Sequence, residues 1–309
     1  MPVVFLMGAT ATGKTQLAVE IAREFPVEII SVDSALIYRG MNIGTAKPDS
    51  TLLSEVPHHL IDIRDPAERY SVSEFLSDTE SLIEQIRARG AIPLLAGGTM
   101  MYFHTLEKGL NNLPEASPEI RKVISHRAEF QGWSALHNEL ATLDPVSASL
   151  IKPSDGQRIQ RALEVFQISG KPMSALSEEI PVPVVSSPLK LILGCDDRSI
   201  IHQRIESRFD QMLFDGFIDE VRHLKSRNDL NEDLPSIRCV GYRQVWEYLD
   251  GLHSPAEMRY RAIVATRQLA KRQLTWLRKY SSAYHVNCLN YRKSAIFQVI
   301  DDAISQVGT

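Results

Sequence analysis

The chain has 309 residues, 44% of them hydrophobic, and a formal net charge of −4. This length and apolar content suit a main domain with a subdomain, and the charge argues against a protein coated in positive groups. No apolar run approaches the roughly 18–20 residues of a membrane span, so we expect no membrane contact.

The first residues and the cysteines indicate the cellular setting. The chain passes directly into an expected strand, without the charged region and cleavage site of a signal peptide, so we expect a cytoplasmic protein. Cys195, Cys239 and Cys288 are odd in number and far apart, which predicts neither a disulfide framework nor a zinc site. No exposed apolar heptad stands out, so we expect a monomer.

In chain order, the first expected elements are strands that alternate with helices. We predict strands over 3–7, 28–32 and 91–98, and helices over 14–25 and about 69–90. This alternation predicts an α/β fold with a doubly wound parallel sheet, of the kind that forms P-loop NTPase-like cores.

The pattern changes near residue 111. The stretch from 118 to about 177 contains only helical patterns, and a Pro-rich linker over 178–188 follows it. The segment 189–196 returns as a sheet strand, and the remainder is largely helical. We therefore expect a core formed by 1–113 and 190–309, with a mostly helical insertion domain over 114–189.

An eight-residue segment near the start, "GATATGKT", matches the phosphate-binding pattern G-x-x-x-x-G-K-[ST]. An expected strand precedes it and an expected helix follows, so its backbone N–H groups would surround phosphate oxygens at a helix N-terminus. Its lysine would bind the outer phosphates, and its last threonine would place a hydroxyl on Mg²⁺. The predicted phosphate-binding residues are Gly8, Ala9, Thr10, Ala11, Thr12, Gly13, Lys14 and Thr15.

Polar groups also follow the next two strands. Asp33 comes just after the strand over 28–32, Gly97 and Gly98 end the strand over 91–98, and Thr99 follows it. Ligands of open α/β sheets bind at the carboxyl ends of the strands, so these groups should meet the phosphates there. Asp33 could act as a general base or could cap the next helix. Thr99 could bind the ligand or cap a helix in the same way.

Two further segments carry groups suited to RNA. Within "SDGQRIQRALEV", Arg158 and Arg161 lie three residues apart and share a helix face, where they could grip phosphate or form an ordinary solvated surface. The segment "SIRCVGYRQVWEYL" places Arg238, Tyr242 and Arg243 around a Gly turn. This combination suits a splayed-out nucleotide, by stacking and phosphate contact.

The stretch 258–279 is rich in Lys and Arg and contains no acidic residue, which indicates an anionic partner. Arg267, Lys271 and Arg278 fall on one stripe of the expected helix. The alternative is an amphipathic helix with a charged outer face. An apolar stripe facing the core is expected at Ala265, Leu269 and Trp276.

Taken together, these motifs resemble the bacterial branch of the tRNA dimethylallyltransferases (tRNA isopentenyltransferases). A phosphate loop alone would be unspecific, whereas "MNIGTAKP", "RIQRALEV" and "TRQLAKRQLTWLR" in this order are highly specific. Leu36 stands where other branches carry Gln, and "GGTMMY" departs from the commoner "GGTGLY" but keeps Thr99. The matching stretches run nearly end to end and also include "SVDSALIYRGMNIGTAKP", "PHHLID", "DPVSASLIKPSDGQRIQRALEV" and "CVGYRQVWEYL".

The resemblance implies transfer of a dimethylallyl group from dimethylallyl diphosphate to N6 of the adenosine at tRNA position 37, beside the anticodon, with Mg²⁺ as cofactor. It implies that Asp33 is the base toward N6, that Thr99 is a close partner, and that Arg208 is a second diphosphate ligand. The partners it implies are the tRNA anticodon stem-loop and the diphosphate donor. With the basic helix included, the expected tRNA-contacting residues are Asp33, Ser34, Ala35, Leu36, Thr99, Arg121, Gln157, Arg158, Ile159, Gln160, Arg161, Arg238, Cys239, Val240, Gly241, Tyr242, Arg243, Arg267 and Lys271.

Other functions remain open on the residues alone. A small-molecule P-loop kinase would explain the phosphate loop and Asp33 but not the acid-free basic helix. A transferase that prenylates free AMP would leave the insertion and the basic C-terminal part without a purpose. A non-catalytic RNA-binding module would not explain Lys14, Thr15 and Asp33 at one sheet edge.

Overall fold

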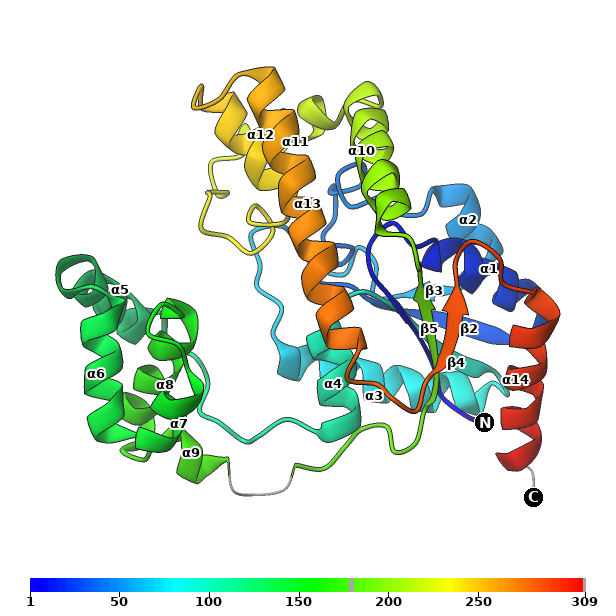
Figure 1. The fold of residues 1–309 in the computed structure, drawn as a ribbon, viewed down its shortest axis with the longest axis horizontal. Coiled ribbons are helices and arrows are strands. Elements are labelled where there is room, and N and C mark those ends of the chain that lie inside the picture. Colours follow the sequence, from blue (N-terminus) through cyan, green and yellow to red (C-terminus); the bar gives the residue numbers. More distant parts are fainter. Residues whose placement is uncertain (178–180, 308–309) are drawn as a thin grey trace. The chain divides into compact units, whose positions relative to one another are not determined.

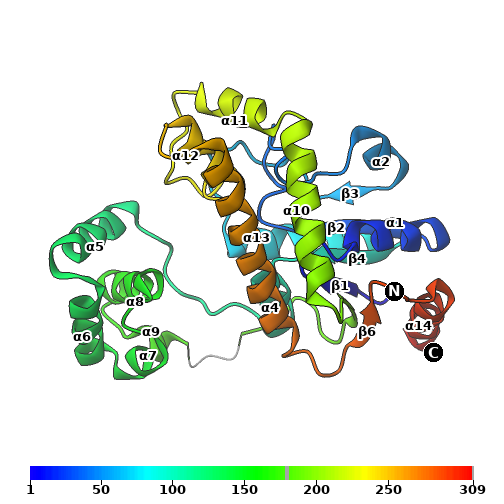
Figure 2. The same ribbon diagram turned by 45° about the horizontal axis from the view of Figure 1, so that its top comes forward.

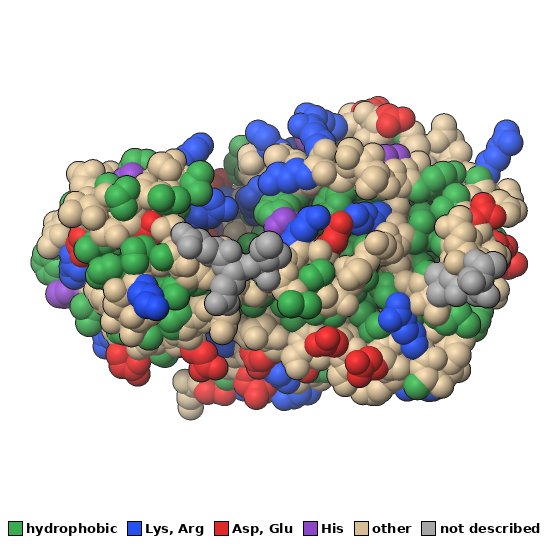
Figure 3. All heavy atoms as spheres, turned by 90° about the horizontal axis from the view of Figure 1, so that it is seen from below, with side chains coloured by type: hydrophobic (Ala, Val, Ile, Leu, Met, Phe, Trp, Pro, Cys, Tyr) green, Lys and Arg blue, Asp and Glu red, His purple; other side chains and the backbone are tan. Residues whose placement is uncertain are grey.

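The computed structural model describes residues 1–177 and 181–307, which form two compact units (Figure 1). The main unit comprises Met1–Glu107 and Val184–Thr309, and the insertion unit comprises Lys108–Pro183. The predicted insertion of 114–189 begins and ends a few residues later than this unit. The first residues of the predicted linker, 178–180, lie outside the described residues. None of the described helices is long and apolar enough to cross a membrane. On one face of the molecule, basic and acidic side chains lie among apolar ones (Figure 3).

A six-stranded sheet of the order β3-β2-β4-β1-β5-β6 forms the centre of the main unit, and all its strand pairs are parallel. The predicted parallel, doubly wound sheet is therefore confirmed. Sequence patterns missed β3 and β6, because two and four residues are too few to show a period. The strands are β1 Val4–Gly8, β2 Val27–Val32, β3 His58–His59, β4 Ile92–Gly97, β5 Leu189–Gly194 and β6 Tyr284–Asn287.

Helices surround this sheet, as Figures 1 and 2 show from two directions. Ser71 caps α3 (Val72–Ala88) through a reciprocal hydrogen-bonded pair with Glu74. The observed helix therefore begins at Val72, a few residues later than the predicted start at about residue 69. The helices of the main unit are α1 Lys14–Glu24, α2 Ser50–Glu55, α3 Val72–Ala88, α4 Met100–Lys108, α10 Arg198–Phe214, α11 Phe217–Lys225, α12 Tyr242–Leu249, α13 Pro255–Leu277 and α14 Lys293–Val307.

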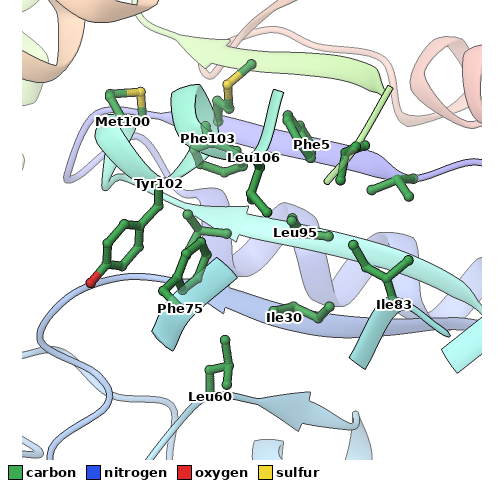
Figure 4. Packing of buried hydrophobic residues seen from close by; sticks show 14 of the residues in the cluster. Phe5, Ile30, Leu60, Phe75, Ile83, Leu95, Met100, Tyr102, Phe103 and Leu106 are labelled. Atoms are coloured by element: carbon green, nitrogen blue, oxygen red, sulfur yellow. The ribbon is translucent and has the colours of Figure 1, made fainter. Parts of the chain in front are cut away.

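Alternation along the strands divides the buried side chains between the two faces of the sheet. Phe5, Ile30 and Leu95 point to one face, where α3 and α4 cover them (Figure 4). On this face the rings of Phe75 and Tyr102 stack with centroids 3.9 Å apart. The side chains between them along the strands join α1 and α14 on the other face. Helices and apolar side chains therefore cover both faces of the sheet. A ligand can bind instead at the carboxyl edge of the sheet.

A third apolar cluster lies among α10, α11, α12 and α13 and the loop after β2. Helices α10 and α13 pack against each other, as both ribbon views show. Glu220 of α11 fixes the loop, because its carboxylate accepts N–H groups from Asn42, Ile43 and Gly44 at 2.9, 2.8 and 3.2 Å. The sequence "MNIGTAKP" therefore begins in a loop that a distant carboxylate holds in place.

The insertion unit is a bundle of helices, and its described residues contain no strand, as predicted. Its core includes Ile124, Leu136, Leu140 and Leu163. Its helices are α5 Pro118–Gln131, α6 Trp133–Leu143, α7 Pro145–Leu150, α8 Gly156–Ser169 and α9 Met173–Leu176.

Candidate active site

A cavity of about 870 Å³ opens at the carboxyl edge of the sheet in the main unit. The loops that follow β1, β2 and β4 line it, together with α10, α13 and the segment before α12. Lys14, Asp33 and Thr99 all line this cavity. The structure thus brings together the strand-end residues that the sequence predicted to meet.

The phosphate loop has the backbone that its sequence demands. Gly13 adopts a left-handed conformation with φ of +94° immediately before α1, which favours glycine. Ala11 has a φ of +65°, an uncommon conformation for a residue with a Cβ and a source of local strain. Thr12 Oγ1 and Lys14 Nζ donate to the carbonyl oxygen of Ala9 at 2.8 and 2.7 Å. The loop is therefore held in a compact turn by its own side chains.

Two residues from distant helices complete the loop. Arg208 of α10 donates from Nη2 to Thr10 Oγ1 at 2.6 Å, so the predicted diphosphate ligand does reach the loop. Gln273 of α13 accepts the N–H of Thr10 at 2.8 Å. The Thr10 N–H is therefore engaged within the protein.

Burial and charge both act on Lys14. Desolvation lowers its pKa to about 8, the Asp33 carboxylate raises it in part, and Arg208 lowers it. Burial likewise lowers the pKa of Arg208, and Asp33 opposes this effect. The cavity therefore holds two desolvated cations beside one carboxylate, an environment that an anionic ligand would stabilise.

We expect the affinity for inorganic pyrophosphate to fall as the pH rises through about 8, because Lys14 then loses its charge. Isothermal titration calorimetry between pH 7 and 9.5 would measure this dependence. Lys14→Arg is the matched control, because a guanidinium keeps its charge over this range while the titration of the ligand is common to both proteins. Parallel pH profiles for the wild type and this variant would contradict the prediction.

Asp33 orders the turn after β2 and lines the cavity. One carboxylate oxygen, Oδ1, accepts the N–H groups of Ala35 and Leu36 at 2.8 and 3.3 Å. The other oxygen has no hydrogen bond within 1–177 and 181–307. The helix-cap interpretation of Asp33 is wrong, because the next helix, α2, begins at Ser50 and is capped by Asp49. One oxygen of Asp33 instead orders a turn, and the other remains available to a substrate.

The remaining strand-end residue, Thr99, lies beside this turn. Its Oγ1 accepts the N–H of Ser34 at 3.2 Å, and its own N–H donates to the Val32 carbonyl oxygen at 3.1 Å. The hydroxyl hydrogen of Thr99 therefore points to no protein acceptor in the described structure. A substrate acceptor atom in the cavity could receive it.

The oxygen groups that line the cavity suit a magnesium ion that is held mainly by the phosphates of a bound substrate. Mg²⁺ typically binds one or two protein oxygens together with substrate phosphates. Thr15 and Asp33 line the cavity and offer a hydroxyl and a carboxylate oxygen. The described residues contain no group of three or more His, Cys, Asp or Glu side chains arranged for a metal, so an all-protein metal cage is not part of this site.

The segment 238–243 departs from the prediction at its aromatic residue. Tyr242 is fully buried, its hydroxyl donates to Glu220 at 2.5 Å, and its ring packs edge-on against Phe217. It cannot stack on a nucleotide in this structure, so that part of the prediction is wrong. The aromatic residue of α13 that lines the cavity is Trp276. The other predicted contacts of this segment, Arg238, Cys239, Val240, Gly241 and Arg243, lie at or next to the cavity wall.

Cys239 is not a candidate nucleophile. Burial raises its pKa to about 12, and the nearby Asp33 charge adds to the effect. The thiol of this half-buried residue is therefore protonated at neutral pH and unreactive.

Acidic residues of α10 neutralise part of the positive charge of the basic helix α13. Arg259 pairs with Glu206 and Asp210 of α10, and Arg267 pairs with Glu206 at 3.3 Å. The predicted apolar stripe is only partly correct, because Ala265, Leu269 and Trp276 are half-buried and, of the three, Trp276 packs against the sheet's apolar cluster. Leu269 and Trp276 line the cavity, whereas the residues of α13 buried in the core are Met258, Ala262, Ile263, Ala270, Gln273 and Leu277. The packing of α10 against α13 sets this rotation, which the helical period alone could not reveal.

In the insertion unit, most of the predicted tRNA-contacting residues have internal partners. Arg121 and Arg161 both pair with the fully buried Glu164, and Gln160 donates to the Arg121 carbonyl oxygen at 3.0 Å. Ile159 is wholly buried in the core, so its side chain cannot contact RNA in this structure. Gln157 and Arg158 are exposed. Arg158 is thus exposed, whereas Arg161, on the same predicted face, is partly exposed and is held by Glu164.

Sequence reasoning missed the cavity-lining residues Leu269, Arg272, Gln273 and Trp276 as site residues. They lie within the motif "TRQLAKRQLTWLR", which pointed to the helix but not to the rotation that turns these positions toward the ligand. No sequence signal marked Gln273, because Gln268 lies in the same motif but is exposed, and only the fold shows which of the two amides is buried.

Comparison with known families agrees with this geometry. An IPP transferase family model matches residues 36–280, and an isopentenyl transferase model matches residues 1–68. A tRNA dimethylallyltransferase of Alkalilimnicola ehrlichii is 56% identical over 90% of this chain and 88% of its own length. A tRNA dimethylallyltransferase of Janthinobacterium sp. is 53% identical over 97% of both chains.

Solved structures give the same result. A tRNA isopentenylpyrophosphate transferase from Bacillus halodurans is 33% identical, with a TM-score of 0.71, over 99% of this chain and 96% of its own. A eukaryotic dimethylallyltransferase acting on tRNA is 26% identical, with a TM-score of 0.83, over 98% of this chain and 79% of its own. From the phosphate loop to the basic helix, therefore, this chain belongs to the IPP transferase family, the prenyltransferases to which the tRNA dimethylallyltransferases belong.

Proposed function

We propose that the protein transfers the dimethylallyl group of dimethylallyl diphosphate to N6 of the adenosine at position 37 of tRNA, with release of diphosphate. The observation that carries this proposal is the single cavity that holds Lys14, Arg208, Asp33 and Thr99. It combines a site for a departing anion with a base and a hydroxyl, next to a wall that includes Leu269 and Trp276. That wall suits a small apolar chain.

The leaving group sets the main catalytic requirement. The donor C1 is allylic, so its bond to oxygen can ionise if the departing diphosphate is stabilised. Lys14, Arg208 and the remaining loop amides would bind that developing charge in a partly desolvated site, where such contacts are strongest. When bound at Thr15, Mg²⁺ would supply further neutralisation of the diphosphate.

The acceptor needs help of a different kind. N6 of adenine is a poor nucleophile, because its lone pair is delocalised into the ring. The free oxygen of Asp33 would accept the N6 proton as the bond to C1 forms. The Thr99 hydroxyl would donate a hydrogen bond to the adenine ring and fix the orientation of the adenine. Since these groups line a cavity, the adenine must leave its stack and enter the protein.

The test is mass spectrometry of tRNA after incubation with the protein and dimethylallyl diphosphate. We expect a gain of one C5H8 unit on a single adenosine. Phosphorylation from labelled ATP without tRNA would favour the kinase, prenylation of free AMP would favour the nucleotide transferase, and tRNA binding without modification would favour the RNA-binding module. The cytoplasmic location and monomeric state stay predictions of the sequence.

The structure separates the two predicted tRNA-contacting cations of α13. Lys271 is exposed and has no ion pair in the described part of the chain, whereas Arg267 already pairs with Glu206. We expect Lys271→Gln to lower the slope of log affinity against log salt by about 1, and Arg267→Gln to lower it less. Filter binding of tRNA at several salt concentrations would measure both slopes.

Arg261→Gln is the matched control for these slopes, because Arg261 pairs with Glu257 on the same helix at 2.7 Å. An unchanged slope in Lys271→Gln would place the tRNA on another surface.

A further inference from the structure

The side chain of Gln273 joins two loops of the active-site cavity. Its Oε1 accepts the N–H of Thr10 in the phosphate loop at 2.8 Å, and its Nε2 donates to the Gly98 carbonyl oxygen at 2.8 Å. The residue is only 9% exposed, and its position on α13 is distant in sequence from both loops. Both ends of the amide are therefore used, and both partners are backbone groups.

These contacts continue to the proposed base. Gly98 precedes Thr99, and Thr99 Oγ1 accepts the N–H of Ser34, the neighbour of Asp33. One side chain thus connects the loop that would hold the diphosphate with the turn that carries the base. Among the described residues, Gln273 is the one whose side chain hydrogen-bonds to both the phosphate loop and the loop after β4.

The fit is close. A Cβ added at Gly98 would lie 2.5 Å from Gln273 Nε2, which is nearer than real Cβ contacts come. Gly98 does not adopt a positive φ, so alanine would meet this contact without backbone strain of its own. The absence of a side chain at position 98 is therefore a requirement of the amide contact.

We infer that Gln273 is a positioning residue, which sets the spacing between the phosphate loop and the Thr99–Asp33 pair. This inference rests on the proposed function, because the spacing matters only if C1 of the donor must meet the adenine N6 while Asp33 accepts the N6 proton. An amide suits the position because it accepts at one end and donates at the other without carrying charge. A displacement of about 1 Å between reacting groups can cost on the order of 10²-fold in rate.

The first experiment compares Gln273→Met with the wild type in single-turnover and steady-state assays of tRNA prenylation. Methionine has a similar length but forms neither hydrogen bond. We expect kcat to fall by about 10- to 100-fold, while the KM for tRNA changes by less than about twofold. Gln268→Met is the matched control, because Gln268 is exposed on the same helix, and it should keep wild-type kinetics.

A double-mutant cycle tests the contact itself. Gly98→Ala should lower kcat by about tenfold or more in the wild type, because the new methyl group displaces the amide, but should cost little in Gln273→Ala, where the amide is absent. Equal losses in both backgrounds would overturn the inference. So would a Gln273→Met variant with a lower melting temperature but a wild-type kcat for its folded fraction.

If Gln273→Met fails to fold, Gly98→Ala alone still tests the inference, because its kcat should fall at unchanged melting temperature. A wild-type protein that does not prenylate tRNA would refute the proposed function. Wild-type activity with unaltered kinetics in the Gln273 variants would refute only the positioning role.

Discussion

Asp33→Asn is expected to lower kcat by about 10²–10⁴-fold while tRNA affinity stays nearly unchanged. The asparagine Oδ1 can still accept the N–H groups of Ala35 and Leu36, so the turn after β2 should survive. What disappears is the basic oxygen that faces the cavity. Rapid-quench single-turnover prenylation, with tRNA affinity measured separately by filter binding, would separate the chemical step from binding.

Asp33→Ala is the useful contrast, because it removes the turn acceptor as well as the base. We expect it to be at least as slow as Asp33→Asn and to lose some tRNA affinity through disorder of the turn. Near-normal turnover in Asp33→Asn would show that another group accepts the N6 proton. Since the Asp33 charge raises the pKa of Lys14, its removal lowers that pKa, so each protein is assayed over a range of pH and compared where its own rate is highest.

The sequence could predict what depends on local pattern. The phosphate loop, the alternation of strands and helices, and the rule that parallel strands present their carboxyl ends at one edge were enough to bring Lys14, Asp33 and Thr99 together. The same reasoning predicted the helical insertion, because the pattern over 118–177 is helical throughout. These features need only neighbours in the chain.

Patterns in the chain could not predict pairs between distant elements. The stretch that contains Arg267 has no acid of its own, yet Glu206 from α10 neutralises part of it. Tyr242 sits among basic residues in the sequence, yet Phe217 and Glu220 of α11 bury it. Gln273 reaches two loops whose positions only the folded sheet determines. In each case tertiary packing decides whether a polar side chain is a ligand or a structural support.

Glu164 makes the same distinction testable in the insertion unit. Its carboxylate is fully buried and accepts hydrogen bonds from Arg121 at 2.8 and 3.1 Å, from Arg161 at 2.7 Å and from the Ser117 N–H at 2.9 Å. Burial alone would raise its pKa, but these donors hold the pKa below its usual value. The stabilisation is therefore present above about pH 4.5 and is lost as the pH falls further.

Replacing this carboxylate, as in Glu164→Leu, is expected to lower the free energy of unfolding of the insertion unit by about 3 kcal/mol. This is the lower end of the range for a broken buried pair, because both arginines are partly exposed and can turn toward water. Urea denaturation would give the stability of the full chain, and hydrogen exchange over 118–169 would assign the loss to this unit. Glu129→Leu, at an exposed position on α5, is the matched control.

The same variant tests whether Arg121 and Arg161 also contact tRNA. Freed from Glu164, the two guanidiniums would add local positive charge, so residues that face RNA should steepen the salt dependence of binding while the unit is still folded. If their role is only internal, stability falls and the salt slope of the folded protein stays the same. A variant that kept full stability would show that the Glu164 carboxylate does not hold the unit together, and the two arginines would then be free to act as ligands.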